Sequence, residues 1–331
     1  MKPLLLTMGD PTGVGPELIV KAWLDGEFDG SQRPLQVVGD IAVLQKAGDI
    51  FGVEIVAERQ AGDSCLLRCA ERTLSLVRCS ELNAEGLTYG RPDRLCGRAM
   101  ADYVEYAAAR CLDGSAAGMV TCPLNKAAIN AAGVNFPGHT ELLAERCDVE
   151  KVVMMLAGAK LKVCLVTTHL PYAEVPRVLS SQEILQTIRI SEQTLRLHFG
   201  VQKPKLAVLA LNPHAGESGL FGDEEARMIA PAIEQAQAEG IEADGPHSAD
   251  TLFHFAVRGS HDAVICMYHD QGLIPLKLLH FEDAVNVTLG LPIVRTSVDH
   301  GTAYDLAGSG KASTTSLVAA IQMAEQMSLN H

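Results

Sequence analysis

Three histidines, His169, His214 and His269, each follow closely on a short apolar run that predicts a β-strand. Imidazole is a common ligand of divalent metal ions, and three imidazoles leave a coordination position open for a substrate. The three are too far apart in the sequence for a local metal motif. Two interpretations therefore stay open: three ligands of one ion, or three separate hydrogen-bonded histidines. If the strands run the same way, their carboxyl ends bring the side chains to one edge of a sheet.

Two aspartates, Asp250 and Asp270, lie near these histidines in the predicted arrangement, and Asp270 directly follows His269. They fit the role of additional metal ligands or of residues that orient the ligating rings. Solvated loop carboxylates are the alternative interpretation.

Cationic and polar residues gather after residue 268, where Lys277, Asn286 and Arg295 follow one another. The chain carries 27 Lys and Arg against 40 Asp and Glu, a net charge of −13. In so acidic a chain, a local supply of cations indicates a site for a phosphate or a carboxylate. Ordinary surface charge is the alternative.

The segment Gly138-His139-Thr140-Glu141 places an imidazole and a hydroxyl after a glycine. His139 fits a contact to a substrate anion or a proton transfer. The alternative is structural: Thr140 caps the start of a helix, with Glu141 in its first turn.

A glycine-rich turn, Gly9–Pro16, follows the first predicted strand, with Pro16 in the first turn of a helix. Such a turn either binds an anion through its backbone N–H groups or is a plain tight turn. It matches neither the G-x-G-x-x-G pattern nor a P-loop. The thiol of Cys122, which follows the predicted strand Met119–Thr121, is interpreted as a small buried hydrophobe.

Short apolar runs alternate with helical patterns, which predicts an α/β fold. We expect amphipathic helices around residues 100–111, 180–195 and 317–324, the second with a capping box formed by Ser180 and Glu183. The clearest predicted strands are Leu4–Met8, Gln36–Val38, Met119–Thr121, Val152–Leu156, Lys162–Thr167, Leu206–Leu211 and Ala263–Met267.

The length of 331 residues suits two packed lobes. The negative charge argues against nucleic-acid and anionic-membrane partners, and no apolar run reaches the roughly 18 residues that span a bilayer. The start of the chain does not resemble a secretory signal. Nine scattered cysteines without a C-x-x-C pair indicate reduced thiols, so we expect a cytoplasmic protein.

Taken together and in order, these motifs resemble the family of 4-hydroxythreonine-4-phosphate dehydrogenases of vitamin B6 biosynthesis. The resemblance covers nearly the whole chain, and the joint set is far more specific than any one motif. The matching segments are residues 7–17, 138–141, 168–171, 212–217, 249–253, 268–272, 286–292 and 295–303.

The resemblance implies an oxidoreductase of pyridoxine biosynthesis that oxidises 4-phosphooxy-L-threonine with NAD or NADP and one divalent metal ion, zinc, magnesium or cobalt. Loss of CO2 then gives 3-amino-2-oxopropyl phosphate. The implied metal ligands are His169, His214 and His269. The implied substrate contacts are His139, Thr140, Lys277, Asn286 and Arg295, and the implied catalytic residues are Lys277, Asp250 and Asp270.

The same resemblance implies a homodimer whose site is completed by the partner chain, with at least one metal-binding histidine from the partner. It also implies the two-lobed architecture of isocitrate and isopropylmalate dehydrogenases, with the active site in the interlobe cleft. We expect a first lobe of residues 1–133 plus 301–331 and a central lobe of residues 134–300. The run His300-Gly301-Thr302-Ala303 resembles the adenine-binding loop of those enzymes.

Three alternatives remain. The loop Pro123–Lys126 resembles a sister group that acts on 4-phospho-D-threonate or 4-phospho-D-erythronate. A metal-dependent hydrolase or lyase would use the same histidines without nicotinamide. A non-catalytic binding protein on a decayed scaffold is the third, although the intact set of candidate residues argues against decay.

Overall fold

The computed structural model describes residues 1–134 and 138–330, without the side chain of His139, and it divides into two compact units. The first unit combines Met1–Glu150 with Leu291–Ser328. The central unit comprises Lys151–Gly290 and the end of the chain. The central unit is therefore shorter at both ends than the predicted residues 134–300. His139, Thr140 and Arg295 consequently belong to the first unit.

The sheet of the first unit has five parallel strands followed by an antiparallel extension. Its strand order is β13-β6-β1-β2-β5-β4-β3. The strands are β1 (Leu4–Thr7), β2 (Leu35–Gly39), β3 (Val56–Arg59), β4 (Ser64–Cys69), β5 (Arg72–Arg78), β6 (Gly118–Thr121) and β13 (Arg295–Val298).

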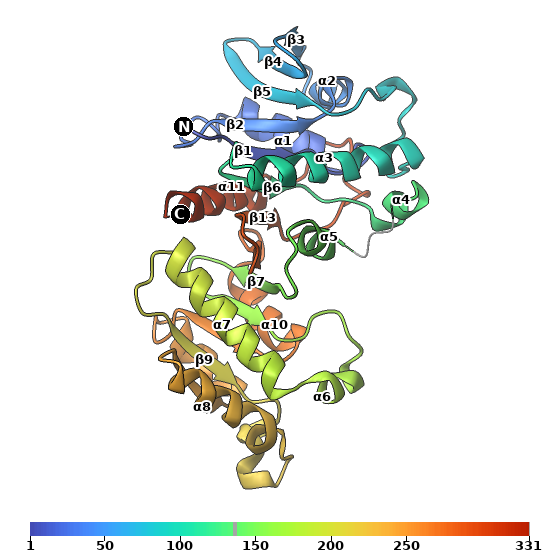
Figure 1. The fold of residues 1–331 in the computed structure, drawn as a ribbon. Coiled ribbons are helices and arrows are strands. Elements are labelled where there is room, and N and C mark those ends of the chain that lie inside the picture. Colours follow the sequence, from blue (N-terminus) through green and yellow to red (C-terminus); the bar gives the residue numbers. More distant parts are fainter. Residues whose placement is uncertain (135–137, 331) are drawn as a thin grey trace. The chain divides into compact units, whose positions relative to one another are not determined.

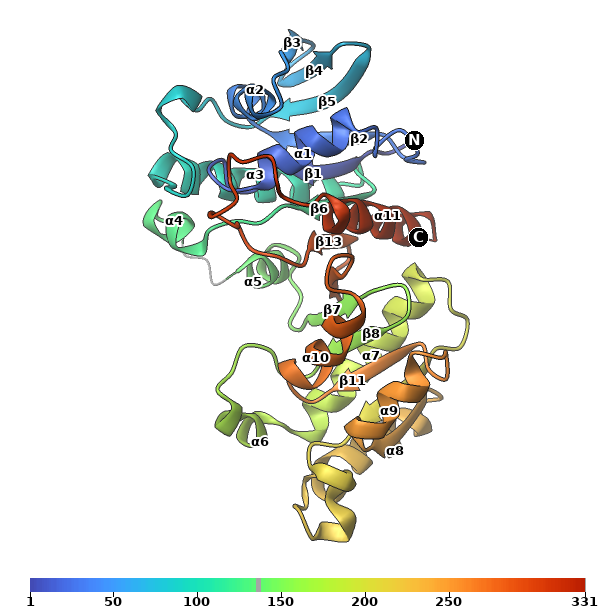
Figure 2. The same ribbon diagram turned by 180° about the vertical axis from the view of Figure 1, so that it is seen from behind.

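Helices cover both faces of this sheet, with α3 nearer the viewer in Figure 1 and α1 nearer the viewer in Figure 2. The helix α1 begins with Pro16 in its first turn, as predicted. The helices are α1 (Gly15–Leu24), α2 (Ile41–Ile50), α3 (Arg94–Leu112), α4 (Lys126–Ala131), α5 (His139–Arg146) and α11 (Thr315–Leu329).

The sheet of the central unit has the order β10-β9-β11-β8-β7-β12. The four strands from β10 to β8 are parallel, whereas β7 is antiparallel to both of its neighbours. The strands are β7 (Val153–Ala157), β8 (Lys162–Leu165), β9 (Lys205–Leu209), β10 (Glu242–His247), β11 (Ala263–Cys266) and β12 (Val285–Leu289).

The helices α7 and α10 lie on opposite faces of this sheet, since α7 is in front in Figure 1 and α10 in Figure 2. A core of buried side chains joins alternate residues of β8, β9 and β11 to α9 and α10. The helices are α6 (Val175–Val178), α7 (Ser181–His198), α8 (Ala230–Ala238), α9 (Ala249–Ala256) and α10 (His269–Leu279).

The α/β prediction is confirmed, and each of the seven predicted strands corresponds to a strand. The N-cap of α7 is also confirmed, because Ser180 Oγ accepts a hydrogen bond of 3.2 Å from Glu183 N. The prediction omitted β3, β4 and β5, as well as β10, β12 and β13. Within the described residues, no helix is long and apolar enough to span a bilayer.

Candidate active site

The three candidate metal ligands follow three neighbouring parallel strands of the central unit. His169 comes after β8, His269 comes after β11 and His214 comes after β9. In the sheet β11 lies between β8 and β9 and is parallel to both. The condition set at the sequence level is therefore met, since the carboxyl ends of these strands share one edge.

Two of these histidines lie side by side. The ring centroids of His169 and His269 are 5.6 Å apart, with an angle of 46° between the planes. Two imidazoles on one tetrahedral ion, with N–metal bonds of about 2.1 Å, place their centroids about 5 Å apart. Both rings line a pocket of about 280 Å³. The spacing of the two rings thus matches that of two imidazoles on a shared divalent ion.

Asp270 orients one of the two rings. Its Oδ1 lies 2.7 Å from Nδ1 of His269. A carboxylate on Nδ1 favours the tautomer with the proton on that nitrogen, which leaves the lone pair of Nε2 for a metal. The side chain of Asp270 is 70% exposed, so it can also reach a ligand in the pocket. The orienting role predicted for Asp270 matches this contact.

Two tyrosines that were not predicted also line the pocket, together with Val175 of α6. The rings of Tyr172 and Tyr268 meet edge to face, with centroids 5.4 Å apart. Burial raises the pKa of Tyr268, so its hydroxyl keeps its proton at neutral pH. A signal was available, because Tyr268 directly precedes His269 and Tyr172 lies three residues after His169.

His214 lies on an unusual turn. Residues 214–218 all have positive φ angles, four of them in residues other than glycine. Such conformations cost about 1–2 kcal/mol per residue, and they persist where the surroundings impose them. The ring of His214 is exposed and lies 6.2 Å from the ring of Phe221, centroid to centroid. The structure thus pairs His169 with His269 and holds His214 on its own turn.

Glu225 stabilises the chain that leads into this turn. Its buried carboxylate accepts hydrogen bonds of 2.8 Å from the backbone N–H groups of Leu211 and Asn212, and one of 3.0 Å from Asn212 Nδ2. These bonds fix the chain immediately before His214. Glu225 is a positioning residue that the sequence analysis missed, since it lies eleven residues further along the chain.

The other candidates of the central unit lie on separate elements. Asp250 is exposed in the first turn of α9, where its Oδ1 accepts a hydrogen bond of 2.6 Å from Ser248 Oγ. Lys277 is half-buried in the last turn of α10. Asn286 lies in β12, paired with Leu156 of β7.

Arg295 is buried in β13 of the first unit, with 2% of its surface exposed. Its Nη2 donates a hydrogen bond of 2.8 Å to Thr121 Oγ1 at the end of β6. Burial lowers the pKa of the guanidinium to about 10, which still leaves it cationic at neutral pH. A buried cation attracts an anionic ligand strongly, because the surrounding dielectric constant is low.

The structural interpretation of Thr140 is wrong, because Gly138 is the N-cap of α5 and no side chain caps it. Thr140 lies inside the first turn and is half-buried, and Glu141 follows it there as predicted. The hydroxyl of Thr140 is therefore not used for capping. The side chain of His139 lies outside the described residues.

The glycine-rich turn Gly9–Pro16 is a structural turn rather than an anion cradle. The backbone N–H of Asp10 donates to Pro123 O at 2.8 Å, and that of Val14 donates to Thr302 O at 3.1 Å. These backbone N–H groups, which an anion would need as donors, already donate hydrogen bonds within the protein. Gly9 has φ +74°, and a Cβ there would lie 2.4 Å from Pro123 O, so the close approach requires glycine.

The same turn is bound to the loop that contains His300, Gly301, Thr302 and Ala303. Tyr304 donates a hydrogen bond of 2.6 Å from its phenol to Asp10 Oδ2, and Asn125 Nδ2 donates one of 2.6 Å to the Tyr304 oxygen. Gly308 N donates to Glu17 Oε2 at 2.7 Å. These bonds fix the chain directly after the four candidate residues. Of the four candidates, His300 and Gly301 are exposed.

Burial raises the pKa of Asp10, and the hydrogen bonds from Tyr304 and Thr12 oppose that rise. The pKa of Tyr304 is raised to about 12 by burial and by the bond to Asp10. Burial raises the pKa of the Cys122 thiol to about 12, and the residue is fully buried, as predicted for a small hydrophobe.

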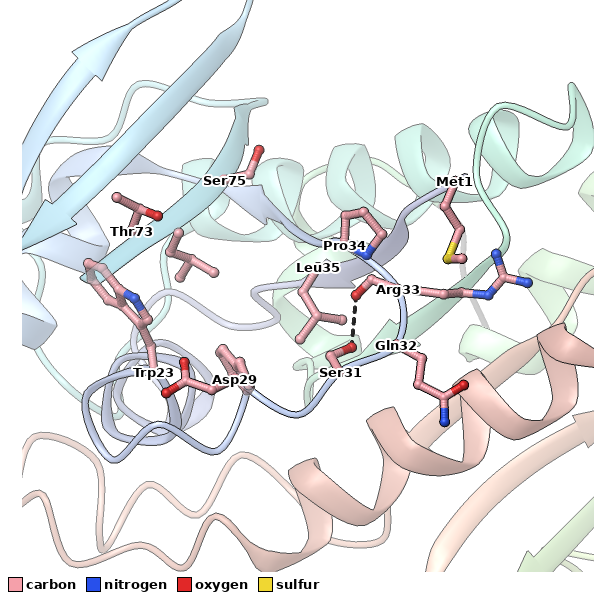
Figure 3. Close-up of a pocket in the computed structure, with 12 residues that line it drawn as sticks. Met1, Trp23, Asp29, Ser31, Gln32, Arg33, Pro34, Leu35, Thr73 and Ser75 are labelled. Atoms are coloured by element: carbon pink, nitrogen blue, oxygen red, sulfur yellow. Dashed lines mark hydrogen bonds between the residues drawn. The ribbon is translucent and has the colours of Figure 1, made fainter. Parts of the chain in front are cut away.

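A pocket of about 500 Å³ lies elsewhere in the first unit (Figure 3), and it contains none of the predicted residues. Trp23, Leu35 and Thr73 line it. Leu35 and Thr73 lie at the starts of β2 and β5, whereas the glycine-rich turn follows the end of the parallel strand β1. The pocket therefore lies at the opposite ends of these parallel strands from the glycine-rich turn.

Known proteins are similar to this chain over nearly its whole length. The family model described as "Pyridoxal phosphate biosynthetic protein PdxA" matches residues 31–324. A relative from Geobacter metallireducens, named 4-hydroxythreonine-4-phosphate dehydrogenase, is 54% identical over 98% of this chain and 95% of its own. A relative from Oceanobacillus iheyensis is 41% identical over 98% of both chains, and its name points to D-threonate 4-phosphate dehydrogenase activity.

Among solved structures, a Klebsiella pneumoniae 4-hydroxythreonine-4-phosphate dehydrogenase superimposes with a TM-score of 0.86. It is 38% identical to this chain, and the match covers 99% of this chain and 100% of that one. The similarity thus extends over both units in sequence and in fold.

Proposed function

The chain belongs to the PdxA family of pyridoxal phosphate biosynthetic proteins, and we propose that it is an NAD(P)-dependent 4-hydroxythreonine-4-phosphate dehydrogenase. Its substrate is 4-phosphooxy-L-threonine, and its product after loss of CO2 is 3-amino-2-oxopropyl phosphate. Two observations together support the proposal. The sequence is 54% identical to a relative of that name, and the candidate ligands His169 and His269 line one pocket.

The reaction needs no oxidant other than the nicotinamide nucleotide. A hydride leaves the carbon that bears the hydroxyl for the nicotinamide, and the hydroxyl proton passes to a base. The resulting β-keto acid loses CO2, and the carbon that carried the carboxylate takes up a proton. Lys277 is the proposed proton donor for this last step, and Asp250 and Asp270 are the candidate carboxylates for the first.

The metal site of the proposal is built on His169, His269 and Asp270, with His214 as the third imidazole. Nitrogen ligands suit zinc or cobalt better than magnesium. When bound, the ion would supply Lewis acidity to the hydroxyl oxygen on the carbon that is oxidised. Asp270 holds the His269 ring in the orientation that presents Nε2.

We propose five residues for recognition of the anionic substrate. Arg295 is the candidate for the phosphate, since a guanidinium binds two phosphate oxygens at once. Thr140 offers a hydroxyl that does not cap the helix, and Asn286 and Lys277 offer further donors. His139 completes the proposed substrate contacts.

The nicotinamide nucleotide is proposed to bind at His300, Gly301, Thr302 and Ala303. The support is the rigid attachment of this loop through Tyr304 and Gly308, while His300 and Gly301 stay exposed. The loop does not distinguish NAD from NADP, and both belong in the assay.

A homodimer in the cytoplasm completes the proposal. The exposure of His169 and His214 at the carboxyl edge of the sheet supports a site that a second chain shares. All nine cysteines are free thiols, which is consistent with a reducing compartment.

A second substrate, 4-phospho-D-threonate, is favoured by one relative's name and by the loop Pro123–Lys126. In the structure this loop is tied to the nucleotide loop, because Asn125 contacts Tyr304 and also caps α4 through Ala128 N. A change in this loop would therefore act next to the proposed cofactor site.

The test is formation of NADH or NADPH by the purified chain with zinc, magnesium or cobalt, using the two substrates in parallel and an EDTA-treated control. Metal-dependent reduction with 4-phosphooxy-L-threonine supports the proposal. Reduction of NAD(P) with 4-phospho-D-threonate but not with 4-phosphooxy-L-threonine would indicate an enzyme of sugar-acid breakdown. Consumption of substrate without any reduced nucleotide would instead indicate the hydrolase or lyase.

A further inference from the structure

A second cluster of metal-ligating side chains lies in the central unit, away from the proposed active site. It consists of Asp244 and His247 of β10 and of His261, which precedes β11. One ligating atom from each residue lies within 4.8 Å of the other two. None of the three was singled out at the sequence level, where a glycine and a proline separate Asp244 from His247.

A local irregularity of β10 brings two of the ligands to one face. In a regular strand, residues three apart point to opposite faces. Here Asp244 is paired with Ala207 and His247 with Leu209, so three steps along β10 match two along β9. Ala207 and Leu209 both belong to the core that packs on α9 and α10. Asp244 and His247 therefore share that face.

The third ligand comes from the segment that leads from α9 back to the sheet. His261 Nε2 lies 3.1 Å from Asp244 Oδ1, and His247 Nε2 lies 2.6 Å from the same oxygen. The two imidazole centroids are 5.8 Å apart. This separation resembles that of the His169–His269 pair.

Hydrogen bonds orient the side chains of this cluster toward one another. Without an ion, Asp244 Oδ1 accepts hydrogen bonds from Nε2 of both histidines. Ser260 Oγ lies 2.8 Å from Nδ1 of His261. An ion would replace the Nε2 proton of His261. With the remaining ring proton on Nδ1 and donated to Ser260 Oγ, the Nε2 lone pair would be directed toward Asp244 and His247.

We propose that Asp244, His247 and His261 form a second site for a first-row divalent metal ion, with zinc as its best-suited occupant. Two imidazoles and one carboxylate are a common zinc ligand set, and they leave a fourth position for water. His261 precedes β11 and His269 follows it, so roughly 13 Å of strand lies between them along the chain. The site is thus distinct from the proposed catalytic one and ties the edge strand β10 to the α9–β11 connection.

The test measures the number of zinc ions bound per chain. The purified protein is stripped of metal and reloaded with zinc by equilibrium dialysis, and its zinc content is determined by elemental analysis. The wild type is expected to hold one ion more than His261→Gln or Asp244→Asn. The matched control His254→Gln, an exposed histidine of α9, is expected to equal the wild type. Ser260→Ala should weaken binding at the site about 10-fold, because the orienting partner of His261 is lost.

A His269→Asn variant separates this site from the catalytic one. It should lose turnover but keep the ion held by Asp244, whereas His261→Gln should lose that ion and keep turnover. Circular dichroism establishes that each variant is folded. Equal zinc content and equal zinc affinity in the wild type and in folded His261→Gln would overturn the proposal, leaving a hydrogen-bonded cluster only.

Discussion

The phenol oxygen of Tyr304 donates a hydrogen bond of 2.6 Å to Oδ2 of Asp10, which is 1% exposed. The bond links two segments almost 300 residues apart in sequence, the glycine-rich turn and the proposed nucleotide loop. Asn125 Nδ2 donates to the same phenol oxygen, which extends the link to the Pro123–Lys126 loop. The three segments are therefore held as one piece within the first unit.

Replacing Tyr304 by Phe should weaken this link. The change leaves a buried carboxylate oxygen without a donor, so we expect a loss of about 1–3 kcal/mol in the free energy of unfolding. The KM for NAD(P) should rise more than the KM for the phosphorylated substrate. Urea unfolding and steady-state kinetics measure the two effects. Tyr106→Phe, a half-buried tyrosine of α3, is the matched control, and equal losses in both variants would contradict the role given to Tyr304.

The stability lost in Tyr304→Phe should depend on pH. Burial raises the pKa of Asp10 above 3.8 and the Tyr304 bond lowers it, so the variant should have a still higher pKa. A carboxyl whose pKa is raised by folding stabilises the protein fully below its unfolded value, and this contribution is lost as pH rises through the folded pKa. The difference from wild type should therefore grow as pH rises above the unfolded value of about 4 and through the raised folded pKa. Unfolding curves at several pH values test this, and a difference that shrinks as pH rises would count against it.

Arg295→Met should impair substrate binding while preserving the buried volume of the side chain. Charge-assisted hydrogen bonds contribute about 1.5–3 kcal/mol, so the KM for the phosphorylated substrate should rise roughly 10- to 100-fold. The KM for NAD(P) should change little. Arg258→Met, an exposed arginine, is the control. An unchanged substrate KM in a folded Arg295→Met protein would exclude the arginine from the phosphate site.

Glu225→Gln should loosen the turn that carries His214. The amide replaces a carboxylate that accepts three hydrogen bonds from Leu211 and Asn212, which precede the histidine. We expect the affinity of the catalytic metal to fall about 10-fold, as is typical for residues that orient a ligand. Metal titration of turnover measures this, with the exposed residue Asp223→Asn as control. Full metal affinity in Glu225→Gln would mean that the turn keeps its shape without the carboxylate.

The arrangement of the three histidines at one sheet edge was predictable from the sequence, because apolar runs of strand length are a strong signal and each one ends in a polar motif. What was not predictable is which side chains meet. His169 and His269 come together because β8 and β11 are neighbours, and strand order is not written in any local pattern.

The errors at the sequence level also have physical causes. Thr140 was interpreted as an N-cap because its side chain suits that position, but Gly138 takes it with extended backbone and no side chain. Strand β10 was omitted because Gly245 and Pro246 interrupt it, although the register shift around them accommodates both. The lobe boundaries were set without a linker signal, and the expected position of the active site between the lobes stays a prediction.

The most direct test of the central claim measures two products of one reaction. Carboxyl-labelled 4-phosphooxy-L-threonine is incubated with the purified chain, divalent metal and NAD(P), and reduced nucleotide and labelled CO2 are followed together. The account predicts equal amounts of both, abolished by EDTA and in His269→Asn. Substrate consumption without reduced nucleotide, or undiminished turnover in metal-depleted protein, would contradict it.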